Sequence, residues 1–222
     1  MNLAKKKKIL DFFLSDGIFF GCHQLKGAFP LEIGKKNQFL VFNLELILKS
    51  LLKVGHIFKE IAICQRQKPL HLLIINSNPE FDNVVRMFAE KLHQSYINNR
   101  WIGGTLTNWQ WISRGVYKFH CIADKFPKYS AKSPKYQKLE RTFFGVNKLN
   151  QKPDIIMLTD ASTQSAILFE AHLSQIPVIA FVDSKTNNEL ITYPIYGNNK
   201  SFNYFQFCFN LFLKIYTKSK KI

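Results

Sequence analysis

The sequence predicts an α/β protein, built as a doubly wound, three-layer parallel sheet of the Rossmann or flavodoxin type. Short apolar runs alternate along the chain with longer segments whose apolar residues recur at helical spacing. Strands that are apolar on both faces belong to parallel sheets covered by helices, and right-handed crossovers join them. With 222 residues and 46% hydrophobic content, the chain can bury one core, so we expect a single domain over residues 1–222.

The first half of the chain contains two expected pairs of a strand and a helix. A strand from Phe39 to Asn43 precedes a helix from Leu44 to about Ile63, where apolar residues recur along one face. The pair repeats with a strand from Leu70 to Ile75 and a helix that Asn78 caps and Pro79 begins. The apolar face expected for this helix consists of Phe81, Val84, Val85, Phe88 and Leu92.

The last third of the chain repeats the alternation. We expect strands at Asp154–Leu158, Val178–Val182 and Ile191–Ile195. A helix from about Thr163 to Ser174 separates the first two strands, and another from about Ser201 to Tyr216 follows the third. The strand at Val178–Val182 is apolar throughout and the other two are mostly so, which is typical of a sheet with both faces covered.

The C-terminal helix is unusually aromatic around more than one face. Its aromatic residues are Phe202, Tyr204, Phe205, Phe207, Phe209, Phe212 and Tyr216. Two interpretations remain open: part of this surface meets a partner protein, or codon bias has placed phenylalanine where a core helix would otherwise carry leucine.

Charge indicates a nucleic-acid partner. The chain has 31 basic and 15 acidic side chains, a net charge of +16 that a polyanion would neutralise. Lysine, asparagine and the 21 phenylalanines have A- and T-rich codons, so this composition indicates a strongly A+T-biased genome such as that of an organelle. No apolar stretch is long enough to span a bilayer, and the N-terminal residues match neither a signal peptide nor a typical transit peptide, which fits synthesis inside the organelle.

The segment from Arg114 to Lys152 is a basic insert that carries half of the net charge. It contains tyrosines and phenylalanines between its basic residues, and Pro127 and Pro134 interrupt any long helix. Such aromatic side chains can stack on unpaired bases while the lysines meet phosphates. The basic residues are Arg114, Lys118, Lys125, Lys128, Lys132, Lys135, Lys138, Arg141, Lys148 and Lys152. The run from Lys5 to Lys8 has the same character; either segment could instead be a solvated face.

The ten residues from Arg100 to Trp109, RWIGGTLTNW, have the composition of a binding loop. Paired glycines permit close backbone approach, tryptophans offer flat faces, and the arginine can pair with a phosphate. We expect Arg100, Thr105, Thr107 and Asn108 to meet phosphate and ribose, and Trp101 to pack. The alternative is a structural turn whose tryptophans lie on the domain's own core.

This string resembles the bacterial-type universal small-subunit ribosomal protein 2 family, in which an Arg-Trp-aliphatic-Gly-Gly stretch runs into Leu-Thr-Asn-Trp. Further pieces occur in the family's order: Asn43-Leu44-Glu45, Pro153-Asp154, Ile176-Pro177-Val178 and Gly197-Asn198. The resemblance implies a structural protein of the small ribosomal subunit that binds ribosomal RNA and neighbouring ribosomal proteins. It also implies a helical hairpin where this chain has the shorter basic insert.

We therefore expect a structural component of an organellar, mitochondrial small ribosomal subunit, located in the matrix, with a plastid or a bacterial cytoplasm as weaker alternatives. The candidate RNA-binding residues are Arg100, Thr105, Thr107, Asn108, Lys5, Lys6, Lys7, Lys8, Lys118, Lys128, Lys132 and Lys135. A regulator that binds RNA outside the ribosome is a rival.

A second rival is a nucleotide- or metal-dependent α/β enzyme using Asp160 and Asp183, which follow two expected strands at the edge where such enzymes bind ligands. No GxGxxG, GxxxxGK[ST] or HExxH string supports it. We expect no enzyme activity, cofactor, metal or small-molecule substrate, and loop roles for both aspartates. Cys22, Cys64, Cys121 and Cys208 form no CxxC pair and are expected to be reduced thiols.

Overall fold

The computed structural model describes residues 20–23, 32–36, 39–65, 68–98, 101–125, 134, 137, 151–183 and 186–220. These residues form two compact units. The first unit holds the described residues up to Pro69, Asp160–Ser162 and those from Ile179 onward. The second unit holds those of Leu70–Thr159 and of Thr163–Val178.

A five-stranded sheet confirms the predicted α/β class. Its strands are β4 (Leu72–Ile75), β5 (Ser95–Ile97), β6 (Ile155–Leu158), β7 (Val178–Val182) and β8 (Tyr193–Tyr196), in the order β5-β4-β6-β7-β8. The pairs β4–β5, β4–β6 and β7–β8 are parallel. The chain adds β5 on one side of β4 and the later strands on the other, so the strand order reverses direction at β4 and β6.

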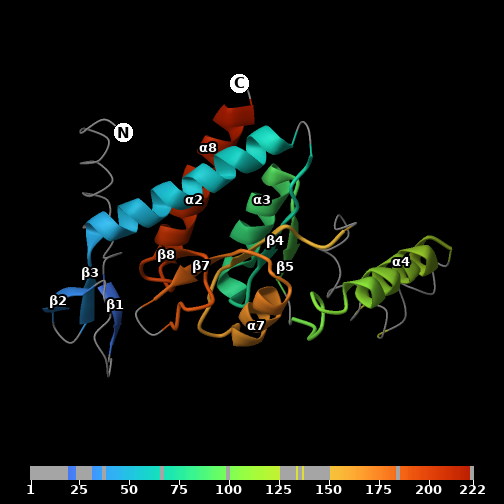
Figure 1. Ribbon diagram of the computed structural model, residues 1–222, viewed down its shortest axis with the longest axis horizontal. Helices are drawn as coiled ribbons and strands as arrows, with labels where there is room; N and C mark the ends of the chain where they lie inside the picture. Colours follow the sequence, from blue (N-terminus) through green and yellow to red (C-terminus); the bar gives the residue numbers. More distant parts are fainter. Residues whose placement is uncertain are drawn as a thin grey trace. The chain divides into compact units, whose positions relative to one another are not determined.

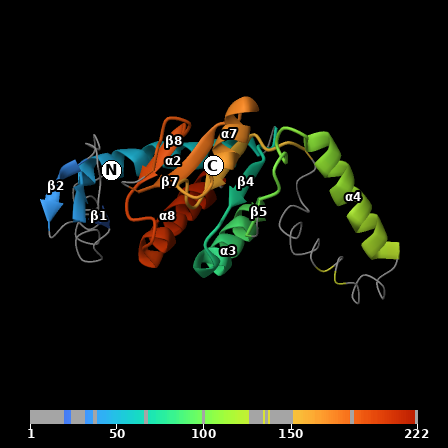
Figure 2. The same ribbon diagram turned by 90° about the horizontal axis from the view of Figure 1, so that it is seen from below.

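The second unit shows how the local sequence produces helix α3 (Asp82–Leu92). The side chain of Asn78 accepts a hydrogen bond from the Glu80 N–H, and Pro79 begins a 3-10 turn, η1 (Pro79–Phe81), that leads into α3. Of the predicted apolar face, all members are buried except Val84, which is half-buried. Figure 2 shows α3 beside β4 and β5. Strand β5 was not predicted, because three residues beginning with a serine carry no readable periodicity.

Helix α4 (Trp109–Lys125) extends into the basic insert and ends two residues before Pro127. Residues 126–133, which include Pro127, lie outside the described residues, so the interruption expected at that proline stays a prediction. Pro134 and Gln137 are the remaining described residues of the insert before Gln151. Helix α7 (Ser165–Leu173) follows β6 and matches the predicted helix with shorter ends.

The first unit corrects the role given to the Phe39–Asn43 strand. It is β3 (Phe39–Phe42), and it pairs antiparallel with β1 (Phe20–His23) and β2 (Glu32–Lys36) in a separate three-stranded sheet, order β1-β3-β2. The expectation of a repeated parallel unit was therefore wrong here. A short apolar run predicts a strand, but its direction of pairing depends on which distant segment meets it.

Helix α2 (Leu44–Cys64) begins at Asn43, whose side chain accepts a hydrogen bond from the Glu45 N–H at 2.9 Å. Within the first unit it lies beside helix α8 (Phe202–Lys220) (Figure 1). The rings of Phe58 and Phe212 stack between them with centroids 4.8 Å apart.

The aromatic residues of α8 are mostly core. Tyr204, Phe205, Phe209, Phe212 and Tyr216 are buried. Phe202 is exposed and Phe207 half-buried. Of the two interpretations of this helix, the core helix is thus confirmed for most of its aromatic positions.

We expect Gly197→Ala to lower the free energy of unfolding by about 1–3 kcal/mol through overpacking. Gly197 has φ of 151°, and a Cβ there would lie 2.6 Å from the buried Tyr204 ring, whose hydroxyl donates to the Tyr196 carbonyl at 2.6 Å. Urea denaturation measures the loss. Gly115→Ala is the control: its Cβ would meet no atom of the described residues within 4 Å on α4, so stability should rise by about 0.5–1 kcal/mol. Equal effects of the two substitutions would contradict the steric account.

Candidate nucleic-acid interface

The described part of the RWIGGTLTNW string, residues 101–108, forms a compact turn that leads into α4. Gly104 has φ of +84°, a conformation that favours glycine, and the Asn108 N–H donates to its carbonyl at 2.7 Å. The Thr105 N–H and hydroxyl both donate to the Ile102 carbonyl, at 3.2 and 2.6 Å. The Asn108 carbonyl then accepts from the N–H groups of Trp111 and Ile112 in the first turn of α4.

One carboxylate holds this loop against α7. Glu170 Oε1 accepts from Trp101 Nε1 at 3.0 Å and from the Gly104 N–H at 2.8 Å, and Oε2 accepts from the Leu106 N–H at 3.1 Å. The Glu170 side chain is buried, and the three donors satisfy a charge that would otherwise be costly to remove from water. Sequence reasoning missed this residue, because a glutamate in a helix is ordinarily solvent-facing and no local pattern marks it as a loop anchor.

The structure separates the candidate residues of the loop. Thr107 and Asn108 are exposed, whereas Thr105 is buried with its hydroxyl donated inside the turn. Trp101 is half-buried, and its Nε1 donates to Glu170. Among the other candidates, Lys118 lies exposed on α4. The remaining candidates, Arg100, Lys5, Lys6, Lys7, Lys8, Lys128, Lys132 and Lys135, lie outside the described residues.

Helix α4 presents an aromatic and basic face that the sequence analysis did not single out. Trp111, Arg114 and Lys118 are spaced by three and four residues, so they lie on one face of the helix, and all three are exposed. Trp111 is 76% exposed and Tyr117, on the flank of this face, is 71% exposed. Such exposure is unusual for large aromatic side chains, which normally bury most of their area. Stacking and phosphate contact are what this combination can provide.

The two aspartates of the enzyme alternative are held by the protein's own loops. Asp160 Oδ1 accepts from the Ser162 N–H at 2.9 Å, the Ser162 hydroxyl at 2.7 Å and Asn199 Nδ2 at 3.0 Å. Asp183 is buried, and its backbone carbonyl accepts from the Thr186 N–H at 3.0 Å. These contacts agree with the loop roles expected from the sequence.

The part of the chain that the structure describes holds neither a cluster of metal ligands nor a membrane-spanning helix. It contains no group of three or more His, Cys, Asp or Glu residues placed to hold a metal ion. None of its helices is long and apolar enough to cross a bilayer. Cys64 and Cys121 are half-buried free thiols, and Cys208 is a buried one whose pKa burial raises well above its ordinary value.

Comparison with known proteins places these features in a family. The model of the family Ribosomal protein S2 matches residues 22–218. Small ribosomal subunit protein uS2m of Marchantia polymorpha is 32% identical over 198 residues, covering 85% of this chain and 81% of that protein. Small ribosomal subunit protein uS2 of Rickettsia prowazekii (strain Madrid E) is 32% identical over 141 residues, which cover 59% of this chain and 48% of that protein. Small ribosomal subunit protein uS2 of Rickettsia bellii (strain OSU 85-389) is 31% identical over 152 residues, which cover 64% of this chain and 52% of that protein. The chain thus spans about half the length of these Rickettsia relatives.

We expect Glu170→Gln to lower the free energy of unfolding by about 1–3 kcal/mol, because an amide cannot accept at both ends and one buried N–H donor loses its partner. Denaturation followed by tryptophan fluorescence measures the loss and reports on Trp101. The matched control is Glu90→Gln, which removes an exposed contact to Arg86 of 2.9 Å on α3 and should change stability by less than about 0.5 kcal/mol. If both variants unfold alike, Glu170 does not anchor the loop.

Proposed function

This chain belongs to the ribosomal protein S2 family, whose members are structural components of the small ribosomal subunit, and we propose that it serves in the ribosome of a mitochondrion. The family match over residues 22–218 carries the ribosomal role. The family is not enzymatic, and the engagement of Asp160 in loop hydrogen bonds leaves the enzyme alternative unsupported.

Two observations favour a mitochondrial ribosome. The uS2m protein of Marchantia polymorpha, whose suffix denotes the mitochondrial version, matches over 81% of its length, whereas the Rickettsia relatives match over about half of theirs. The lysine- and phenylalanine-rich composition also fits an A+T-biased organellar gene. A matrix location follows from this proposal.

Contact with ribosomal RNA is proposed to centre on α4 and the adjoining turn. Arg114 and Lys118 would neutralise phosphates, and Trp111 would stack on an unpaired base. Thr107 and Asn108 are exposed and available to ribose and phosphate, whereas the Thr105 hydroxyl is already used within the turn. Such contacts position the protein rather than read a sequence. The proposal retains the candidates outside the described residues, namely Arg100, Lys5 to Lys8, Lys128, Lys132 and Lys135.

Contact with neighbouring ribosomal proteins is supported by helix α7. Phe169 and Leu173 lie four residues apart on one face of this helix and are 58% and 59% exposed. Large apolar side chains that gather on a surface mark a protein interaction site more often than scattered ones do.

Sedimentation tests the ribosomal role against that of a free RNA-binding regulator. A tagged copy of the chain, expressed in mitochondria of the source organism, should co-migrate with the small subunit through a sucrose gradient after a high-salt wash. A structural component stays within the particle because many contacts must release together, whereas a regulator held by a few phosphates dissociates. A peak confined to the top fractions would exclude the ribosomal role.

We expect the double variant Arg114→Ala, Lys118→Ala to bind small-subunit ribosomal RNA more weakly and with less dependence on salt. Each phosphate that the variant no longer neutralises should reduce the logarithmic salt slope by about 0.7–0.9, hence by about 1.4–1.8 for the pair. Filter binding at several salt concentrations measures this slope. The control is Lys53→Ala, Lys59→Ala, two exposed lysines of α2 whose removal changes the net charge equally. An equal reduction in both double variants would mean that only net charge matters.

A further inference from the structure

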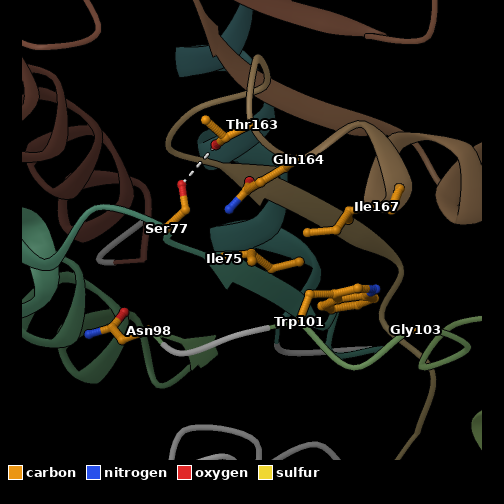
Figure 3. Close-up of a pocket in the computed structure, with 9 residues that line it drawn as sticks. Ile75, Ser77, Asn98, Trp101, Gly103, Thr163, Gln164 and Ile167 are labelled. Atoms are coloured by element: carbon orange, nitrogen blue, oxygen red, sulfur yellow. Dashed lines mark hydrogen bonds between the residues drawn. The ribbon is translucent and has the colours of Figure 1, made fainter.

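A cavity of about 520 Å³ in the second unit has a lining that the ribosomal role does not use (Figure 3). Ser77 and Thr163 approach each other on one side, their hydroxyl oxygens 3.1 Å apart, and Trp101 forms the opposite side. The lining also includes Gln164, Asn98 and Ile167. None of the described residues that line the cavity is charged. Its volume lies within the range of small-molecule sites.

The position of the cavity in the sheet favours a ligand. It opens beyond the carboxyl end of β4, at Ile75 and Ser77. It also lies beside Thr163 and Gln164, which precede α7, and the first turn of that helix. Strands β4 and β6 are neighbours, and the strand order reverses at this pair. In open α/β sheets the crevice outside the carboxyl ends of the strands at such a reversal is where ligands bind.

Two buried carbonyl oxygens in the lining have no hydrogen-bond donor among the described residues. Gln164 is 7% exposed, and its Oε1 has no hydrogen-bond partner among the described residues; the same holds for Asn98 Oδ1, although Asn98 Nδ2 donates to the Asp82 carbonyl at 2.9 Å. Gln164 is also the N-cap residue of α7 without making a side-chain capping bond. Buried polar groups are normally hydrogen-bonded. A ligand with N–H donors would therefore supply partners for Gln164 Oε1 and Asn98 Oδ1.

Trp101 adds a flat apolar wall. Its ring is fixed in place by the Nε1–Glu170 bond of 3.0 Å, so little conformational freedom is lost when a second ring stacks on it. The uncharged character of the described lining residues disfavours a phosphate or carboxylate inside the cavity. A neutral, planar ring with N–H donors satisfies the orphan carbonyls and uses the tryptophan face. Side-chain amides pair in this way with adenine, accepting from N6 and donating to N7.

We propose that this cavity binds an adenine base stacked on Trp101 and hydrogen-bonded to the Gln164 and Asn98 amides. The base comes either from a free adenine nucleotide or from an unstacked adenosine of an RNA strand. The proposed binding is non-covalent. It can be measured on the isolated chain, so its test does not depend on the ribosomal role.

The test is calorimetric titration of the full 222-residue chain with AMP and with UMP. UMP is the matched probe, because its base has no exocyclic amino group. AMP should bind at least tenfold more tightly than UMP. Gln164→Met should weaken AMP binding at least tenfold without lowering the unliganded melting temperature, since it removes an acceptor that has no partner among the described residues. Gln206→Met, on the exposed side of α8, is the control and should bind AMP like the unchanged chain.

The source of the base is decided by comparing AMP with the tetranucleotide oligoadenylate. Tighter binding of the oligonucleotide that is also abolished in Gln164→Met assigns the cavity to an RNA adenosine; tighter binding of AMP assigns it to a free nucleotide. Equal binding of AMP and UMP, or unchanged AMP binding by Gln164→Met, would overturn the proposal. A chain that fails this test yet sediments with the small subunit leaves the ribosomal role intact.

Discussion

The carboxylate of Glu170 is the interaction on which the candidate interface depends. Three donors from Trp101, Gly104 and Leu106 converge on it, so a loop without regular secondary structure acquires a fixed path over α7. The same contacts orient the Trp101 ring, and the turn that follows supplies the first hydrogen bonds of α4. A single buried charge thereby organises a stretch whose backbone groups would otherwise need water.

The buried sheet and the exposed turn with α4 have different roles. Strands β4 and β7 of the parallel sheet are buried and apolar, and the exposed residues that we propose to meet RNA lie on the turn and on α4. The edge of the sheet at which α/β enzymes place reactive groups carries Asp160 in a closed set of loop hydrogen bonds. The binding through charge and stacking that we propose for the surface of this Rossmann-like scaffold fits a family of structural ribosomal proteins.

Aromatic content alone does not show whether a helix packs in the core or lies on the surface. In α8 most rings are core: Phe181 of β7 contacts Phe205 and Phe209 with centroids 4.2 and 6.0 Å apart. On α4, by contrast, Trp111 and Tyr117 remain exposed. The sequence showed aromatic residues both in the C-terminal helix and in the basic insert, and burial distinguishes the positions that pack in the core from those that stay on the surface.

Local patterns were sufficient for β4, β6, β7, the helices α2, α3, α7 and α8, and the Asn78 cap, because each depends on side chains only a few residues apart. The RWIGGTLTNW string, together with shorter pieces in the same order, likewise indicated the family, which the family match confirms. Tertiary structure alone decided the antiparallel pairing of β3, the existence of β5, the burial of Thr105, and the meeting of Glu170 with residues 64 to 69 positions away. Those outcomes are set by which distant segments come together, and no periodicity within one segment records its partner.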